Sequence, residues 1–346
     1  MSNNAHLNER EMAMAHALEI SGNEVAFAVR GEPAWHKLGM VFDKDQTVTT
    51  SEMLEMAKLN NWNVRLEDLA VPEGYTNSAS NQLVVRDNPF TNTPEVLSVV
   101  GDRYKVVQNE ELFAFGDGIL DGGATWESAG SIKGGRQIFG SLSVPREFIL
   151  DPEGANDKTV TYLLVHTSHD GSTAVSASIT PVRVVCQNTL NVALKNTKQS
   201  FKIRHTATVG GRIDEARRVL GLTYDHLDNF ETVARELFET SMTDAQFNEI
   251  VKAIYPEPES GSAKVAQTRW SNKVDLLNDL WTTSVTNANI KNTAWGALNA
   301  MTERIDYFRT ARKDGEALIG GASGFDPVVN AEKNRILGAV LEFARA

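Results

Sequence analysis

The spacing of apolar residues changes once along this chain, near residue 210. Before that point, apolar and polar residues alternate over short runs such as 62–66, 126–132 and 159–167, which is the period of β-strands. After it, apolar residues recur every three or four positions over long runs, which is typical of helices. The pattern predicts an α+β protein, with antiparallel β-hairpins or a meander packed with helices in the N-terminal two thirds and a helical C-terminal third.

Glycine-rich turns predict how the strands pair. Two hairpins are expected, 126–132 with 137–144 and 159–167 with 173–179. Their turns contain Gly134-Gly135 and Asp170-Gly171, which supply the positive φ angles that tight hairpin turns need. A further hairpin or meander is expected over 83–100, where Asn88-Pro89 and Thr93-Pro94 mark a turn.

Three regions follow from these patterns. They are a polar N-terminal extension over 1–13, an α+β core domain over 14–221 and a helical region over 222–346 with a linker near 256–262. Helices are expected to start after the capping residues Thr50 and Asn109, and another from Asn188 onward. A helix is also predicted to begin at residue 213. It is followed by further predicted helices over 226–239, 244–254, 263–283, 293–312 and 330–344.

The chain has no segment that predicts a membrane or secreted location. No apolar run reaches the roughly 18–20 residues that span a bilayer. The N-terminus lacks the basic start and apolar stretch of a secretory signal, and the single cysteine, Cys186, excludes an intrachain disulfide. These features predict a cytoplasmic protein that does not contact a membrane.

Charge is distributed unevenly along the chain. The formal net charge is −11, yet residues 183–218 hold eight basic side chains and two acidic ones. A second stretch, 128–146, contains three basic residues and no acidic one. Such segregation is typical of a polyanion-binding face on an acidic protein. The alternative is that these cations pair with carboxylates from elsewhere or simply face solvent.

The stretch 195–205 favours nucleic acid as that polyanion. It combines lysines and arginines with amides and one aromatic ring. Cations neutralise phosphates, while an aromatic side chain can stack on the bases of a single strand. The alternative is an edge strand whose lysines prevent sheet-to-sheet aggregation. The expected phosphate contacts are Lys133, Arg136, Arg183, Lys195, Lys198, Lys202, Arg204 and Arg212, and Phe201 is the expected stacking residue.

A metal site is the first catalytic alternative. His166, His169 and Asp170 lie together at a predicted hairpin, and His205 or His36 could complete a set. Zinc takes three or four ligands, but the strand period places 166 and 169 on opposite faces unless the turn intervenes. A turn stabilised by polar side chains accounts for the same residues.

Two other chemical patterns are weaker. Cys186 has His205 as a conceivable base, but its valine neighbours predict a buried thiol that behaves as a small apolar residue. The glycine-rich, basic loop 130–136 lacks the phosphate-loop pattern and lies between two strands, so it suits a hairpin tip that touches a phosphate backbone. No cofactor and no catalytic residue are predicted.

Several specific stretches recur together in one family. They are 14–19 with 31–39, 168–172 with 180–190, and 292–303, which reads Asn-Thr-Ala-Trp-Gly-Ala-Leu-Asn-Ala-Met-Thr-Glu. In these stretches the chain resembles the phage/plasmid-like protein family that is catalogued as domain of unknown function number 932. The resemblance covers nearly the whole chain after residue 13. It implies carriage by phages, plasmids and other mobile elements, and it assigns no role to any residue.

A mobile-element context favours work on DNA. The leading hypothesis is a single-stranded DNA binding or annealing protein of a phage or other mobile element, which acts as a homo-oligomer in recombination or replication. Annealing proteins of phages are similar in their plan of hairpins packed on helices, although this analogy concerns the fold alone. The alternatives are an effector that binds a host or defence protein and a metal-dependent hydrolase or nuclease.

Overall fold

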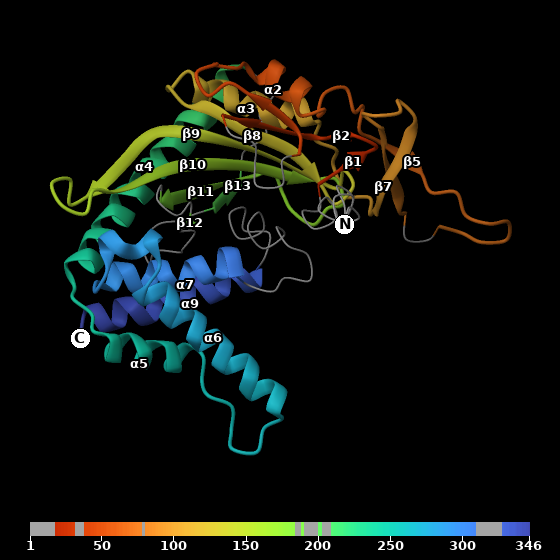
Figure 1. The fold of residues 1–346 in the computed structure, drawn as a ribbon. Helices are drawn as coiled ribbons and strands as arrows, with labels where there is room; N and C mark the ends of the chain where they lie inside the picture. The colour runs from red at the N-terminus through yellow and green to blue at the C-terminus, as the bar shows by residue number, and fades with distance from the viewer. Residues whose placement is uncertain are drawn as a thin grey trace, which may run out of the picture.

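The computed structural model describes most of the chain. The described residues are 18–31, 38–77, 80–183, 188–189, 200–202, 209–308 and 327–346. Antiparallel sheets occupy the N-terminal two thirds and helices the C-terminal part, which confirms the predicted α+β class. Figure 1 shows the main sheet between a layer of helices and a separate helical bundle.

The main sheet has eight strands in the order β12-β11-β10-β9-β8-β3-β4, and β13 also pairs with β11. All its pairs are antiparallel except the parallel pair β3–β4. Both predicted hairpins, β8–β9 and β10–β11, form its centre. The strands are β3 (Phe27–Arg30), β4 (Met40–Phe42), β8 (Thr125–Ile132), β9 (Gln137–Leu150), β10 (Asp157–Ser168), β11 (Ser176–Arg183), β12 (Asn188–Thr189) and β13 (Ser200–Lys202).

Two small sheets flank one end of the main sheet. One pairs β1 (Ile20–Ser21) with β2 (Glu24–Val25). The other has the order β5-β6-β7 and contains β5 (Arg65–Asp68), β6 (Gln82–Asp87) and β7 (Pro94–Val100). Strands β6 and β7 correspond to the hairpin or meander predicted over 83–100. The backbone of residue 18 also bridges Ile132 at the end of β8, which places the β1–β2 sheet beside the β8–β9 turn.

Three helices contribute to the first hydrophobic core: α2 (Thr50–Met56), α3 (Asn109–Leu120) and α4 (Val209–Glu239). Trp126 of β8 stacks on Phe113 of α3 with 5.0 Å between ring centroids. A Cβ on Gly116 would lie 2.4 Å from the Trp126 ring, so glycine allows this helix to approach the sheet closely. The resulting core fixes the central strands against the helical layer.

The C-terminal helices enclose a second core. They are α5 (Asp244–Ile254), α6 (Lys264–Thr282), the 3₁₀ helix η1 (Val285–Ile290), α7 (Ala294–Phe308) and α9 (Pro327–Ala344). Helix α7 is buried on all sides over its first thirteen residues, so the other helices pack around it. Phe247 and Trp281 stack with 4.7 Å between their centroids and join α5 to α6.

Helix α4 connects the two cores. Residues up to Leu227, such as Ala216 and Val219, contribute to the first core, and residues from Phe230 onward, such as Leu237, contribute to the second. In Figure 1 it runs down the left side of the sheet from the upper helical layer to the bundle. The boundary that the sequence predicts between residues 221 and 222 therefore lies inside one continuous helix. The predicted linker at 256–262 lies between α5 and α6.

Three local predictions were wrong. The N-cap of α2 is Thr49, not Thr50, and that of α3 is Gln108, not Asn109. The buried Asn109 side chain donates from Nδ2 to the Leu59 carbonyl, and its Oδ1, the atom that would cap a helix, lies 3.0 Å from His169 Nε2 instead. Residues 188–189 form β12 rather than the start of a helix, because the outer edge of β11 supplies backbone partners for them.

Candidate nucleic-acid interface

The strand register brings three predicted cations to one end of the main sheet. Lys133 and Arg136 occupy the β8–β9 turn, and Gln137, the next residue, pairs with Ser168 at the end of β10. Lys202 of β13 pairs with Ser176, the first residue of β11. The backbone N–H of His169 donates to the Arg136 carbonyl at 2.8 Å, which joins the β8–β9 turn to the β10–β11 turn.

These three side chains are exposed. Arg136 donates through Nε to the Lys133 carbonyl at 2.9 Å, which holds its guanidinium against its own turn. None of the three forms an ion pair with a carboxylate in the described part of the chain. Burial raises the pKa of nearby Asp170, but hydrogen bonds from Ser172 and the charge of Arg136 outweigh it and lower that pKa. Asp170 therefore stays ionised as the local counter-charge.

The structure adds two cations that the sequence analysis missed. The Tyr104 hydroxyl donates to the Ser168 carbonyl at 3.2 Å, and a Cβ on Gly171 would lie 3.7 Å from the Tyr104 ring. This contact places the exposed Arg103 and Lys105 beside the β10–β11 turn. Their segment is short and contains Asp102, so no acid-free run marks it in the sequence.

We call the five exposed cations at this end of the sheet the basic end. Its members are Arg103, Lys105, Lys133, Arg136 and Lys202. Burial raises the pKa of Tyr104 to about 12, with the charge of Asp170 as a further cause, so its hydroxyl remains a donor at neutral pH. That hydrogen bond fixes the segment that carries Arg103 and Lys105.

Two other predicted phosphate contacts, Arg183 and Arg212, are not members of the basic end. Arg183 ends β11 opposite Thr159, about 24 Å along the strand from Ser176. Arg212 lies in the first turns of α4, the helix whose Arg218 donates to the Lys202 carbonyl at 3.4 Å.

Several predicted residues are only partly described or not described. Phe201 lies in β13 opposite Ala177, but its side chain and those of Arg183 and Arg212 lie outside the described part of the structure. The residues that lie entirely outside it are Lys195, Lys198, Arg204, Cys186, His36 and His205.

His166 and His169, which the sequence offered as an alternative metal site, are buried side chains at this end of the sheet. Burial lowers the pKa of His166 to about 4. Burial, with the charge of Arg86 as a second cause, lowers the pKa of His169 to about 4 as well. His169 Nε2 lies 3.0 Å from the Asn109 amide oxygen. Within the described ranges, no three His, Cys, Asp or Glu residues are grouped so that they could hold a metal ion.

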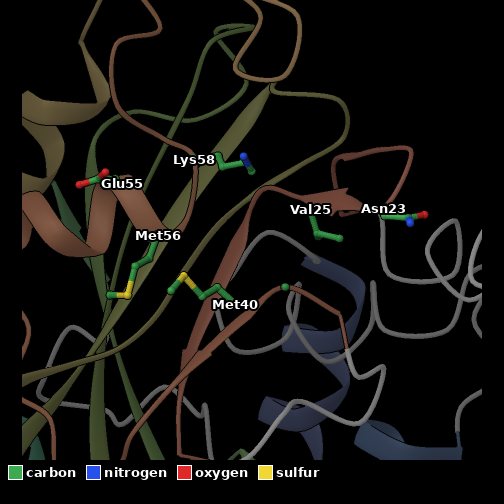
Figure 2. A pocket seen from close by; sticks show the side chains of 7 residues that line it. Asn23, Val25, Met40, Glu55, Met56 and Lys58 are labelled. Atoms are coloured by element: carbon green, nitrogen blue, oxygen red, sulfur yellow. The ribbon is translucent and has the colours of Figure 1, made fainter.

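A pocket of about 480 Å³ lies between the β1–β2 hairpin, β4 and α2 (Figure 2). Its walls include the apolar side chains of Val25, Met40 and Met56. Lys58 lines it too, and its ammonium group forms an ion pair with Glu24 at 2.7 Å. Asn23 and Glu55 also line it, so the pocket combines apolar walls with an amide, a carboxylate and an ion-paired ammonium group.

No helix in the described ranges is both long and apolar enough to cross a bilayer. Comparison with known proteins returned one family, described as Domain of unknown function (DUF932), whose model matches residues 96–319. No curated protein and no solved structure matched the chain. The matched region extends from β7 to beyond α7 and so includes all five cations of the basic end and most of both cores. Because the model covers more than half of the sequence, the chain belongs to the DUF932 family.

Proposed function

We propose that this protein binds single-stranded nucleic acid through the basic end, as a non-enzymatic binding or annealing protein of a mobile element that acts in DNA recombination or replication. The observation that carries the proposal is the convergence of exposed cations on one end of the main sheet. Lys133 and Arg136 lie at the β8–β9 turn, and Lys202 lies beyond β10 and β11 on the same end.

The width of the basic end suits a polyanion rather than a single phosphate group. Strands are spaced by ~4.8 Å, so the three spacings from β9 to β13 cover about 14 Å. A span of this width has room for several phosphates in a row, whose charges the cations would neutralise together. The net charge of −11 repels a polyanion from the rest of the surface and so favours this end.

The shape of the basic end favours a single strand over a duplex. It is built from turns and a strand edge, and none of its five cations lies on a helix that could enter a major groove. Single strands are held by cationic tracks that contact the backbone. The contacts are to phosphates, so binding is expected to depend little on sequence and strongly on salt.

Self-association belongs to the same proposal. In the described ranges β4 ends the main sheet and β7 ends the β5–β7 sheet. Met40 on β4 is 51% exposed, and Val96 and Val99 on β7 are 54% and 51% exposed. Exposed apolar side chains on edge strands are typical of contact surfaces. The molar mass measured by light scattering is expected to be that of a homo-oligomer, both with and without a single-stranded oligonucleotide.

The central test measures binding of a labelled single-stranded oligonucleotide at several salt concentrations. The Lys133→Ala/Arg136→Ala variant removes two expected phosphate contacts. The logarithmic salt slope is therefore expected to fall in magnitude by about 1.4, with weaker binding at low salt. The matched control is Lys264→Ala/Arg269→Ala, which removes two exposed cations from α6 and changes the net charge equally.

Three results would reject the proposal. They are no binding by the natural sequence, binding that is indifferent to salt, and equal weakening by both double variants. The last result would mean that net charge, rather than the basic end, attracts the strand. The protein-binding alternative would then be tested by isolating a stable protein partner.

A further inference from the structure

A fully buried arginine lies beneath the turns of the basic end. Arg86 of β6 is 0% exposed. It bonds both carboxylate oxygens of Glu19, with Nη1 3.0 Å from Oε2 and Nη2 in contact with Oε1. It also donates to Glu95 of β7 from Nε at 3.1 Å and from Nη2 at 2.8 Å. The guanidinium is therefore fixed by two carboxylates from separate segments of the chain.

The β8–β9 turn rests directly on this guanidinium. A Cβ on Gly135 would lie 2.3 Å from Arg86 Nη1, so only glycine allows the turn to come this close. Ser131, near the end of β8, donates through Oγ to Glu19 Oε2 at 2.6 Å. The turn that carries Lys133 and Arg136 is thus seated on the arginine and on its carboxylate partner.

The β10–β11 turn is linked to Arg86 through Trp62. The guanidinium carbon of Arg86 lies 4.0 Å from the centroid of the Trp62 ring, and that ring lies 5.9 Å from the ring of His169. His169 also accepts a hydrogen bond at its carbonyl from the Ser98 hydroxyl of β7, at 2.7 Å. Arg86 therefore supports this turn by stacking and through the strand that carries Glu95.

The segment 101–105 is held between two parts of the same assembly. It leaves β7, which carries Glu95 and Ser98, and it leads to Asn109 at the start of α3. The Asn109 amide oxygen lies 3.0 Å from His169 Nε2. The β8–β9 turn and the segment 101–105 carry four of the five cations. The first contacts Arg86 directly, and the second is joined to it through the β10–β11 turn and Trp62.

We infer that Arg86 is the positioning residue of the basic end: it sets the relative placement of the β8–β9 turn, the β10–β11 turn and the segment 101–105. This inference rests on the proposed function for its consequence, which is simultaneous contact of several cations with one strand. Arg86 itself does not contact the strand, because its side chain is fully buried. Planar guanidinium geometry is required, since an ammonium group cannot bond two carboxylates and stack on an indole in the same way.

The test compares Arg86→Lys with Arg65→Lys. Arg65 is a matched control because it lies in the same three-stranded sheet and also bonds two carboxylates, Glu67 and Asp87, each at 2.8 Å, but it is partly exposed. Arg86→Lys retains the charge, which reduces the risk of unfolding. Glu19→Gln is a second variant that weakens the same assembly from its other side.

Two measurements are made on each variant. The first is amide hydrogen exchange without ligand. In Arg86→Lys and Glu19→Gln, exchange is expected to become several-fold faster in the β8–β9 turn, the β10–β11 turn and the segment 101–105. In Arg65→Lys, exchange in these three segments is expected to stay unchanged. Salt-dependent binding of the single-stranded oligonucleotide is expected to show a smaller slope for Arg86→Lys, because fewer phosphates are contacted at once. A purely structural role would change the melting temperature without changing that slope.

The outcomes separate the two proposals. Unchanged exchange in Arg86→Lys, or faster exchange in only one of the three segments, would overturn the positioning role. An unchanged salt slope in a variant whose three segments exchange faster would also overturn it. If exchange became faster in all three segments but the natural sequence bound no oligonucleotide, the proposed function would be rejected. The positioning role of Arg86 would then be retained.

Discussion

At the scale of single residues, burial decides the chemistry of the histidines. His166, His169 and His226 all have their pKa lowered to about 4 by burial. Each is therefore neutral at physiological pH and takes part in packing, as in the parallel rings of His226 and Phe230 at 6.5 Å. From the sequence, two of these histidines were candidates for a metal site. Their surroundings instead favour a role in the interior of the fold.

This burial predicts how stability depends on pH. The pKa of each histidine is lower in the folded state than the ordinary value of 6.5, so the unfolded state binds protons more readily. Their stabilising contribution is fully present above pH 6.5 and is lost as the pH falls towards 4, by up to about 3 kcal/mol each. Urea unfolding between about pH 7 and 4.5 measures this change.

The His226→Phe variant is the control for that measurement. It retains a ring that can stack on Phe230 and removes one titrating group. Its free energy of unfolding is expected to fall less steeply with decreasing pH than that of the natural sequence. Equal slopes for the two proteins would contradict the assignment of the pH dependence to buried histidines.

At the scale of elements, the β8–β9 turn must both reverse the chain and pack closely against Arg86. Lys133, Gly134 and Gly135 all adopt positive φ, at 57°, 64° and 82°. Local chain reversal requires this conformation, and it explains the two glycines. Only Gly135 also meets a tertiary demand, because it lies against the Arg86 guanidinium.

The two glycines can be distinguished by substitution. Gly134→Ala meets nothing within 4 Å, so it is expected to cost only the strain of the left-handed conformation, about 1–2 kcal/mol. Gly135→Ala carries the same strain and also displaces a buried, hydrogen-bonded guanidinium, so it should be clearly more destabilising. Thermal unfolding measures both variants. Equal losses would mean that Arg86 moves aside freely and does not seat the turn.

At the scale of the whole molecule, the sheet and the C-terminal bundle are joined by buried polar contacts as well as by α4. Asp157, the first residue of β10, is fully buried. Its Oδ2 accepts from the indole N–H of Trp295 in α7 at 2.8 Å, and its Oδ1 accepts from the Asn289 amide at 3.3 Å. These bonds fasten the bundle to the left-hand end of the sheet in Figure 1.

Removing that carboxylate should uncouple the two cores. Asp157→Ala leaves buried donors of Trp295 and Asn289 without this acceptor, at a cost of about 1–3 kcal/mol. Asp244→Ala is the matched control, since Asp244 accepts from the Trp281 indole at 2.8 Å within the bundle. Denaturant unfolding followed by tryptophan fluorescence is expected to broaden or split only for Asp157→Ala. A single sharp transition in both variants would show that α4 alone maintains the coupling.

Much of the fold was predictable because its signals are local. The two central hairpins follow from alternation and from Gly134-Gly135 and Asp170-Gly171, and helix α5 has the predicted bounds. The caps of α2 and α3 were displaced by one residue, since neighbouring polar residues compete for that position. Residues 188–189 were predicted as helical because apolar spacing does not report the free edge of β11 that pairs with them.

The candidate site was predictable only in part, because it depends on contacts between residues far apart in the chain. Composition identified Lys133, Arg136 and Lys202 as cations, but only the register of β9, β10, β11 and β13 places them at one end of the sheet. The same register places Arg183 at the other end. Arg86 looks like an ordinary strand residue, yet its partner Glu19 lies 67 positions away and leaves it fully buried. Periodicity and turn chemistry act over a few residues and so determine the elements, whereas the grouping of charges requires the assembled sheet.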